Sequence, residues 1–143
     1  MKSNDWRNQI NIISGMLASY GYNVCEYTDA VDQVDLESKS VHINSRKHAE
    51  SRFYTLLHEL GHVDIYENSA DEFESNHPVY VQAVCGQTYH SKAGRVSLLA
   101  EEIQAWKKGR IFAREADLYI DDAKYNQHMT EAIISYINWA ATQ

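Results

Sequence analysis

Apolar residues recur at helical spacing along the first part of the chain. The stripe that they form on one helix face contains Trp6, Ile10, Ile13, Leu17 and Tyr20. Gly21 follows this stripe, and glycine is favoured just after a helix because it adopts positive φ without steric cost. The pattern therefore predicts an N-terminal helix that ends next to Gly21 and buries one face.

Shorter runs of apolar and polar residues follow that helix. They cover residues 24–27, 31–36 and 41–43, and the polar stretch 37–40 has the length of a turn. This alternation predicts a small β-hairpin or a three-stranded sheet. An extended peptide could add to the edge that residues 41–43 would form, through main-chain hydrogen bonds.

The helical period returns in three later segments, at about residues 47–65, 97–116 and 121–140. Residues 66–95 show no clear helical period, and within them 79–84 are expected to form a strand or one helical turn. The predicted order is one helix, a small sheet and three helices, which is typical of the α+β class. The irregular segment lies between two helices, so we expect it to lie near any site that those helices share.

Apolar stripes in these helices predict which side chains face the core. In the first of the three the stripe is Phe53, Leu56, Leu57 and Leu60. In the last helix the inward residues are expected to be Tyr125, Met129, Ala132, Ile133, Tyr136, Ile137 and Ala140. Each helix therefore has enough apolar surface to pack against a common core.

The composition is that of a folded domain. Of 143 residues 44% are hydrophobic and 23% are charged, so we expect one domain over residues 1–143. The chain has 13 Lys and Arg against 20 Asp and Glu, and its net charge of −7 disfavours direct binding to nucleic acid. No apolar run suits a membrane helix, and no signal-peptide pattern opens the chain. Cys25 and Cys85 are expected to be reduced thiols, which predicts a cytoplasmic location.

Residues 58–62 read His-Glu-Leu-Gly-His, an H-E-x-x-H pattern inside a predicted helix. His58 and His62 are four residues apart, so they are separated by about 40° around the helix and can reach one metal ion. Glu59 lies beside them and is the candidate general base that takes a proton from the attacking water. The apolar stripe points elsewhere, so the core and the metal site occupy different faces of this helix.

A catalytic zinc ion needs a third protein ligand. The helix at 97–116 offers Glu101 and Glu102, and Glu102 is the only charge on its apolar stripe, whereas Glu101 is expected on the polar face. Because a buried carboxylate needs a partner, Glu102 is the predicted ligand; the alternative is that it pairs with a lysine or arginine. His77 and His90 remain rival ligands. The same stripe contains Ala105 and Gly109, whose small size lets two helices approach closely.

The motif at 58–62, followed by Glu-Ile-Gln-Ala-Trp at 102–106, resembles the ImmA/IrrE family of minimal gluzincin metallopeptidases over residues 5–116. The resemblance implies a zincin-like fold in which His58, His62 and Glu102 bind Zn²⁺ and Glu59 is the general base. It also implies an intracellular enzyme; members are often carried by phages or mobile elements, and several cleave DNA-binding regulators. Trp106 stands where many members have Asn, residues 66–95 are longer than in the smallest members, and we expect no appended helix-turn-helix or sensor domain.

Two functions follow as expectations. The first is a cytoplasmic zinc endopeptidase with a narrow range of protein or peptide substrates, such as a DNA-binding regulator. The second is a zinc-containing module that docks to a regulator or host protein without cleaving it. A donor to the substrate oxyanion is expected between the two ligand helices, and the candidates are His77, Tyr80, Tyr89 and His90. An acidic run over residues 67–74 could favour a basic partner.

Overall fold

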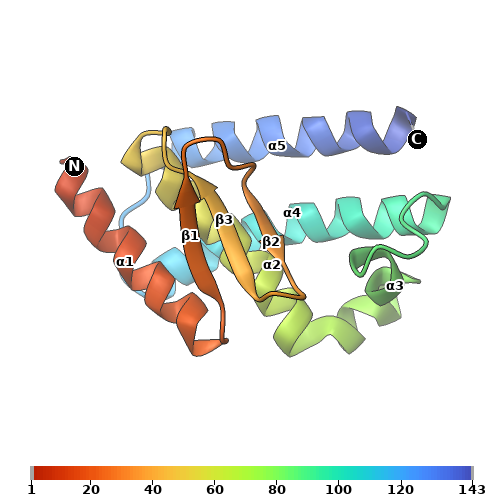
Figure 1. Cartoon of the computed structure of the whole chain (residues 1–143). Coiled ribbons are helices and arrows are strands. Elements are labelled where there is room, and N and C mark those ends of the chain that lie inside the picture. Colours follow the sequence, from red (N-terminus) through yellow and green to blue (C-terminus); the bar gives the residue numbers. More distant parts are fainter. Residues whose placement is uncertain (1, 143) are drawn as a thin grey trace.

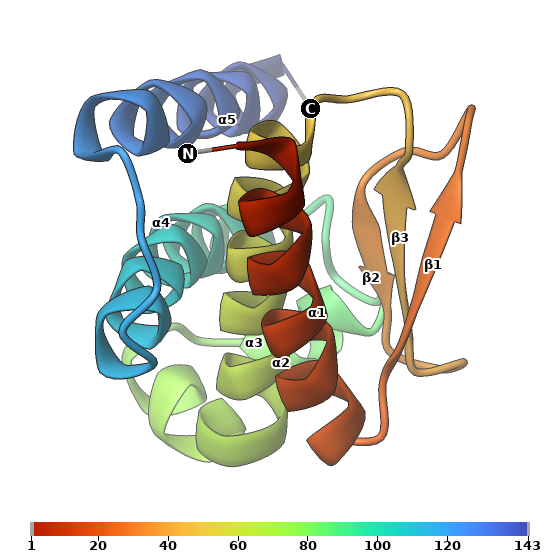
Figure 2. The same cartoon turned by 90° about the vertical axis from the view of Figure 1, so that its left-hand side faces the viewer.

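The computed structural model describes residues 2–142, and these form an α+β fold with five helices and a three-stranded mixed sheet. Helices α1 and α2 lie between the sheet and the pair α4 and α5 (Figures 1 and 2). The elements in chain order are α1 (Ser3–Ser19), β1 (Asn23–Tyr27), β2 (Gln33–Asp35), β3 (Ser40–Asn44), α2 (Ala49–Asn76), α3 (Tyr80–Val84), α4 (Lys92–Glu115) and α5 (Asp122–Thr142). The α+β prediction is confirmed.

The predicted N-terminal helix is also confirmed. Four residues of its apolar stripe are buried: Trp6, Ile10, Ile13 and Leu17. They pack against α2, and the helix ends just before Gly21, whose φ is +87°. Positive φ at this position explains why the sequence has a glycine there.

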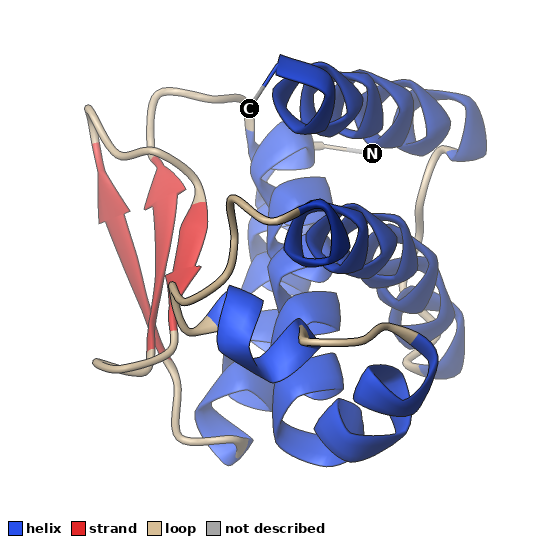
Figure 3. Cartoon of the chain, turned by 90° about the vertical axis from the view of Figure 1, so that its right-hand side faces the viewer, coloured by secondary structure: helices blue, strands red, loops and turns tan. Residues whose placement is uncertain are grey.

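The sheet has β3 in its centre. β3 pairs with β1 in parallel and with β2 antiparallel, so that Val41 has Val24 on one side and Val34 on the other. Val41 and Ile43 are fully buried against the helices. The expectation that residues 41–43 form an edge is therefore wrong, because both sides of β3 are already hydrogen-bonded. β2 is a free edge of the sheet instead (Figure 3).

Close packing of α2 and α4 defines the middle of the molecule. A Cβ atom added at Gly61 would lie 2.2 Å from the main-chain oxygen of Ala105, and one added at Gly109 would lie 2.8 Å from that of Leu57. The expected close approach at Ala105 and Gly109 is therefore confirmed, and Gly61 is its counterpart on α2. Only residues without a bulky side chain fit at this crossing.

The expectation of a long irregular segment over residues 66–95 is wrong. Helix α2 continues to Asn76 with a kink at Ser69, where φ is −140° and ψ is 23°. The short helix α3 follows, and α4 starts at Lys92 after Ser91, whose Oγ accepts a hydrogen bond from the Gly94 N–H. The sequence shows no helical period here because this part of the chain packs around a small second cluster only. The buried members of that cluster are Ile65, Tyr80 and Ala105.

Helix α5 covers α4, and the stripe predicted for it packs on the core in its first half, where Met129, Ala132 and Ile133 are partly buried against the core. Tyr125 is fully buried, whereas Tyr136 and Ile137 are 37% and 42% exposed. The inward placement expected for these two residues is therefore wrong. None of the helices in residues 2–142 is long and apolar enough to cross a membrane.

Candidate metal centre

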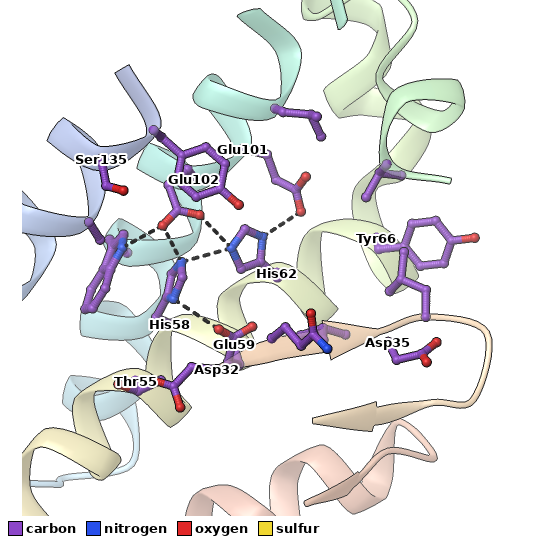
Figure 4. Close-up of a pocket in the computed structure, with 18 of the residues that line it drawn as sticks. Asp32, Asp35, Thr55, His58, Glu59, His62, Tyr66, Glu101, Glu102 and Ser135 are labelled. Carbon is purple, nitrogen blue, oxygen red and sulfur yellow. Dashed lines mark hydrogen bonds and ion pairs between the residues drawn. The ribbon is translucent and has the colours of Figure 1, made fainter. Parts of the chain in front are cut away.

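Both histidines of the H-E-x-x-H motif point from α2 to one spot. Their Nε2 atoms lie 2.9 Å apart, and His58 is buried while His62 is partly buried. The spacing of four residues accounts for this, since it brings both side chains to the same side of the helix. The predicted convergence of His58 and His62 is therefore observed (Figure 4).

Glu102 of α4 reaches the same spot. Its Oε1 lies 3.0 Å from Nε2 of His58, and its Oε2 lies 3.0 Å from Nε2 of His62. Four-coordinate zinc with bonds of about 2.0–2.1 Å separates its donor atoms by about 3.3 Å. Two imidazoles and a carboxylate at these separations therefore fit one zinc ion to within a few tenths of an ångström.

Glu59 lies next to this triangle of donor atoms. Its Oε1 is 3.4 Å from Nδ1 of His58, which is the ring nitrogen outside the triangle. His58, Glu59 and His62 form a group whose donor atoms are close enough to hold a metal ion. Since both Nε2 atoms face Glu102, Glu102 fits better as the third ligand, and Glu59 fits better as a carboxylate beside the metal.

Glu102 has no lysine or arginine partner within residues 2–142. The groups that contact its carboxylate are His58, His62 and the indole of Trp106, whose Nε1–H donates to Oε1 over 3.2 Å. The expected alternative, an ion pair with a basic residue, is therefore not found. Trp106 also stacks on the His58 ring, with centroids 4.3 Å apart and planes at 10°, so it orients two of the three donors.

Glu101 is buried, which the sequence analysis did not predict. The Nδ1–H of His62 donates to its Oε1 over 2.7 Å, and only 4% of Glu101 is exposed. Its neighbour on this face, Ser97, is buried as well and donates from Oγ to the main-chain oxygen of Pro78 over 2.7 Å. The expected polar surface is covered because the segment around α3 folds onto this side of α4.

The charges of the centre are strongly coupled. Burial acts to raise the pKa of Glu102, but hydrogen bonds from His58 and His62 outweigh it and hold that pKa well below its usual range. Burial acts to lower the pKa of His62, but Glu101 and Glu102 outweigh it and raise that pKa well above its usual value. Three carboxylates surround two imidazoles here, and this excess of negative charge favours a bound cation.

An open cleft of about 1200 Å³ lies over the centre. One wall comes from residues 32–37, which include β2, and another comes from α5, so that Asp32 and Asp35 lie on the strand side and Ser135 lies on the α5 side (Figure 4). Residues 83–86 and Tyr89 also line it. The expectation that residues 66–95 help to form the groove holds for these positions.

Three of the four residues proposed as oxyanion donors lie away from the cleft. His77 packs on Phe73 with centroids 4.3 Å apart, and His90 packs on Tyr89 with centroids 3.8 Å apart; neither lines the cleft or reaches the centre. Tyr80 is fully buried in the second cluster. His77 and His90 are therefore also ruled out as ligands in this structure, and Tyr89 is the one candidate that lines the cleft.

The acidic run of residues 67–74 does not face the cleft. Two of its carboxylates are used within the protein: Glu67 accepts a hydrogen bond from the Tyr22 hydroxyl over 2.7 Å, and Glu74 accepts one from the Val81 N–H over 2.7 Å. None of these residues is among those that line the cleft. The structure therefore gives the run a role in anchoring α2 and α3, without a place at the site.

Comparison with protein-family models, with curated proteins and with solved structures finds no match to this chain. The side chains of the centre and the cleft over it are the features that bear on function. Two residues that the sequence analysis did not assign to the site, Glu101 and Tyr136, contribute to these features. The signal for Glu101 was its position next to Glu102; the signal for Tyr136 appears only when α5 is placed over α4.

Proposed function

We propose that this protein is a zinc metallopeptidase with a zincin-like fold, similar to the minimal gluzincins of the ImmA/IrrE type. The observation that carries the proposal is the triangle of donor atoms from His58, His62 and Glu102, all about 3 Å apart, with Glu59 beside it. Two imidazoles and a carboxylate on these helices are the ligand set of a catalytic zinc site.

The ligands would hold zinc in a fixed orientation. Trp106 restrains His58 and Glu102, and Glu101 accepts the Nδ1–H of His62, which leaves the Nε2 lone pair directed into the triangle. When bound, zinc supplies a Lewis acid that polarises a carbonyl and makes water acidic near neutral pH.

Glu59 is the proposed general base. It is 3% exposed, and it lies beside the ligands without being needed to complete them. Its carboxylate would take a proton from the attacking water and deliver it to the nitrogen of the leaving amine. A module that only docks to a partner has no use for a carboxylate at this position.

The cleft supports a protein or peptide substrate. β2 is a free sheet edge on one wall, so an extended chain could pair with it and pass over the centre. Asp35 and Glu37 on this wall and Glu131 on the α5 wall are acidic, which favours a basic substrate segment, such as one in a DNA-binding regulator. Cys25 and Cys85 are unpaired, which fits a reducing compartment, so we place the enzyme in the cytoplasm.

The test compares the wild type with Glu59→Gln in a lysate of the natural host. New protein termini are mapped by mass spectrometry, and zinc is measured on the same preparations. We expect zinc in both proteins and new termini only with the wild type, with activity reduced by about 10²–10⁴-fold in the variant. Equal cleavage by both proteins would reject Glu59 as the base. A cellular effect that persists in Glu59→Gln without cleavage would favour the docking function.

A further inference from the structure

One face of α5 forms a wall of the cleft. The α5 residues that line the cleft are His128, Glu131, Ala132, Ser135 and Tyr136. Their spacing is that of a single helix face, i, i+3, i+4, i+7 and i+8. The sequence analysis assigned Tyr136 to the core stripe of this helix. In the structure Tyr136 lies on a second face of α5, which lines the cleft together with the residues of the metal centre.

Two hydrogen bonds set the register of α5 on α4. The Tyr125 hydroxyl donates to the main-chain oxygen of Trp106, and Arg95 Nη1 donates to that of Ala140 over 3.0 Å. Glu101, Glu102 and Tyr136 all lie between these two points. Because helical side chains lean toward the N-terminus of their own helix, the Tyr136 side chain extends toward the part of α4 that carries the two glutamates.

The hydroxyl of Tyr136 is available to a ligand. Its ring meets Trp139 edge-on at 6.0 Å, and the hydroxyl makes no hydrogen bond within residues 2–142. The residue is 37% exposed, and it lines the open cleft. An unpartnered donor on the wall of a cleft can bind a substrate acceptor without breaking a bond inside the protein.

The charges that act on the Tyr136 hydroxyl are consistent with a position close to the metal centre. Burial and the charges of Glu102, Glu59 and Glu101 raise its pKa far above the usual range for tyrosine. The hydroxyl therefore lies within electrostatic reach of all three carboxylates of the centre, and it keeps its proton. A protonated phenol at this place can donate a hydrogen bond to an oxygen that enters the cleft.

The other tyrosines of the cleft are placed differently. The Tyr66 hydroxyl contacts Cys85 Sγ at 3.9 Å, and the charges that act on it come from Cys85 and Glu67. Tyr89 packs on His90 outside the helices and is 38% exposed. Tyr136 thus combines a place on the wall of the cleft with the charges of Glu59, Glu101 and Glu102 nearby.

We propose that Tyr136 is a catalytic residue whose hydroxyl donates a hydrogen bond to the carbonyl oxygen of the peptide bond under attack. This inference rests on the proposed peptidase function. As the water oxygen bonds to the carbonyl carbon, the π pair of the C=O bond moves to the oxygen, and Glu59 takes the water proton. Tyr136 keeps its own proton and stabilises the charge that develops on that oxygen.

Tyr136→Phe tests the proposal, because it removes the hydroxyl and keeps the ring. Tyr27→Phe is the control, because Tyr27 is an exposed tyrosine of β1 that does not line the cleft, and Tyr136→His restores a donor. The first readout is the affinity of the zinc-loaded proteins for acetohydroxamate, measured by calorimetry; this probe offers a carbonyl oxygen and needs no side-chain pocket. The second readout is kcat and KM at the cleavage sites mapped with the wild type.

We expect Tyr136→Phe to keep its zinc, to bind acetohydroxamate about tenfold more weakly, and to lose about 10²–10³-fold in kcat with little change in KM. Tyr136→His should recover part of both losses, and Tyr27→Phe should resemble the wild type. Wild-type affinity and kcat in Tyr136→Phe, or loss of its zinc, would overturn the proposal while leaving the peptidase function intact. A wild type that binds neither zinc nor acetohydroxamate would overturn both.

Discussion

The crossing of α2 and α4 differs in kind from the walls of the cleft above it. At the crossing, Gly61 lies against the main chain of Ala105, and Glu102 is 1% exposed. On the walls, β2 has only three residues, and Tyr136 is 37% exposed. The crossing depends on tight packing and places the proposed ligands, whereas the walls leave side chains free for a substrate. We therefore expect changes at the crossing to act on metal binding and folding, and changes on the walls to act on turnover.

The largest effect is expected from His62→Ala. This change removes one of three donors, so zinc bound at about one per chain in the wild type should be lost, and the melting temperature should fall toward that of the chelator-treated protein. Metal analysis and thermal unfolding of the same samples measure both. Full zinc content in His62→Ala would show that the metal lies elsewhere.

Gly61→Ala should destabilise the fold by at least about 2–3 kcal/mol, because the new Cβ would overlap the Ala105 carbonyl and force the two helices apart. Gly15→Ala on α1 is the control, since a Cβ there meets nothing within 4 Å; it should be stabilising by about 0.5–1 kcal/mol. Urea unfolding measures the free energy of both variants. A neutral Gly61→Ala would mean that the helices separate without cost.

Glu101→Ala should weaken zinc binding by about 10–100-fold, since His62 would lose the acceptor that orients its ring. Glu115→Ala, an exposed position near the end of the same helix, is the control and should leave zinc affinity unchanged. Competition with a chelator measures the affinities. If Glu101→Ala bound zinc like the control, the contact with His62 would be unimportant for the metal.

The smallest effect is expected from Ser97→Ala, which removes the hydrogen bond from Ser97 to the Pro78 oxygen. Unfolding free energy should fall by about 1 kcal/mol, because a buried acceptor loses its partner. Zinc affinity should stay the same, since Ser97 touches none of the proposed ligands. A loss of zinc affinity in this variant would show that the segment before α4 supports the centre directly.

Much of the arrangement of α2 and α4 around the site could be predicted from the spacing of residues along each helix. The spacing of His58 and His62 places both imidazoles on one face of any helix, and Ala105 and Gly109 leave room for a close neighbour. Glu102 followed from its place on an apolar stripe. These inferences concern single helices, whose geometry is the same in every fold.

The positions that pattern did not predict depend on a partner from a distant part of the chain. Glu101 has polar neighbours at helical spacing, so the sequence places it on a polar face. In the structure it is buried, because α3 and the residues before α3 fold over this face of α4. The central position of β3 depends on β1 reaching it in parallel. Apolar residues likewise show no helical period over residues 66–76, because this part of α2 packs on a small cluster and needs few apolar side chains.

The sequence by itself determined the two histidines, the glutamate between them and the type of element that carries them, because these follow from the helical repeat over a few residues. Only the tertiary structure decided between Glu102 and the rival ligands His77 and His90, showed that Glu101 contacts His62, and placed Tyr136 on the wall of the cleft. The physical reason is that burial and charge at these positions are set by helices that meet across the fold, and the packing of α4 and α5 is not encoded in either helix alone.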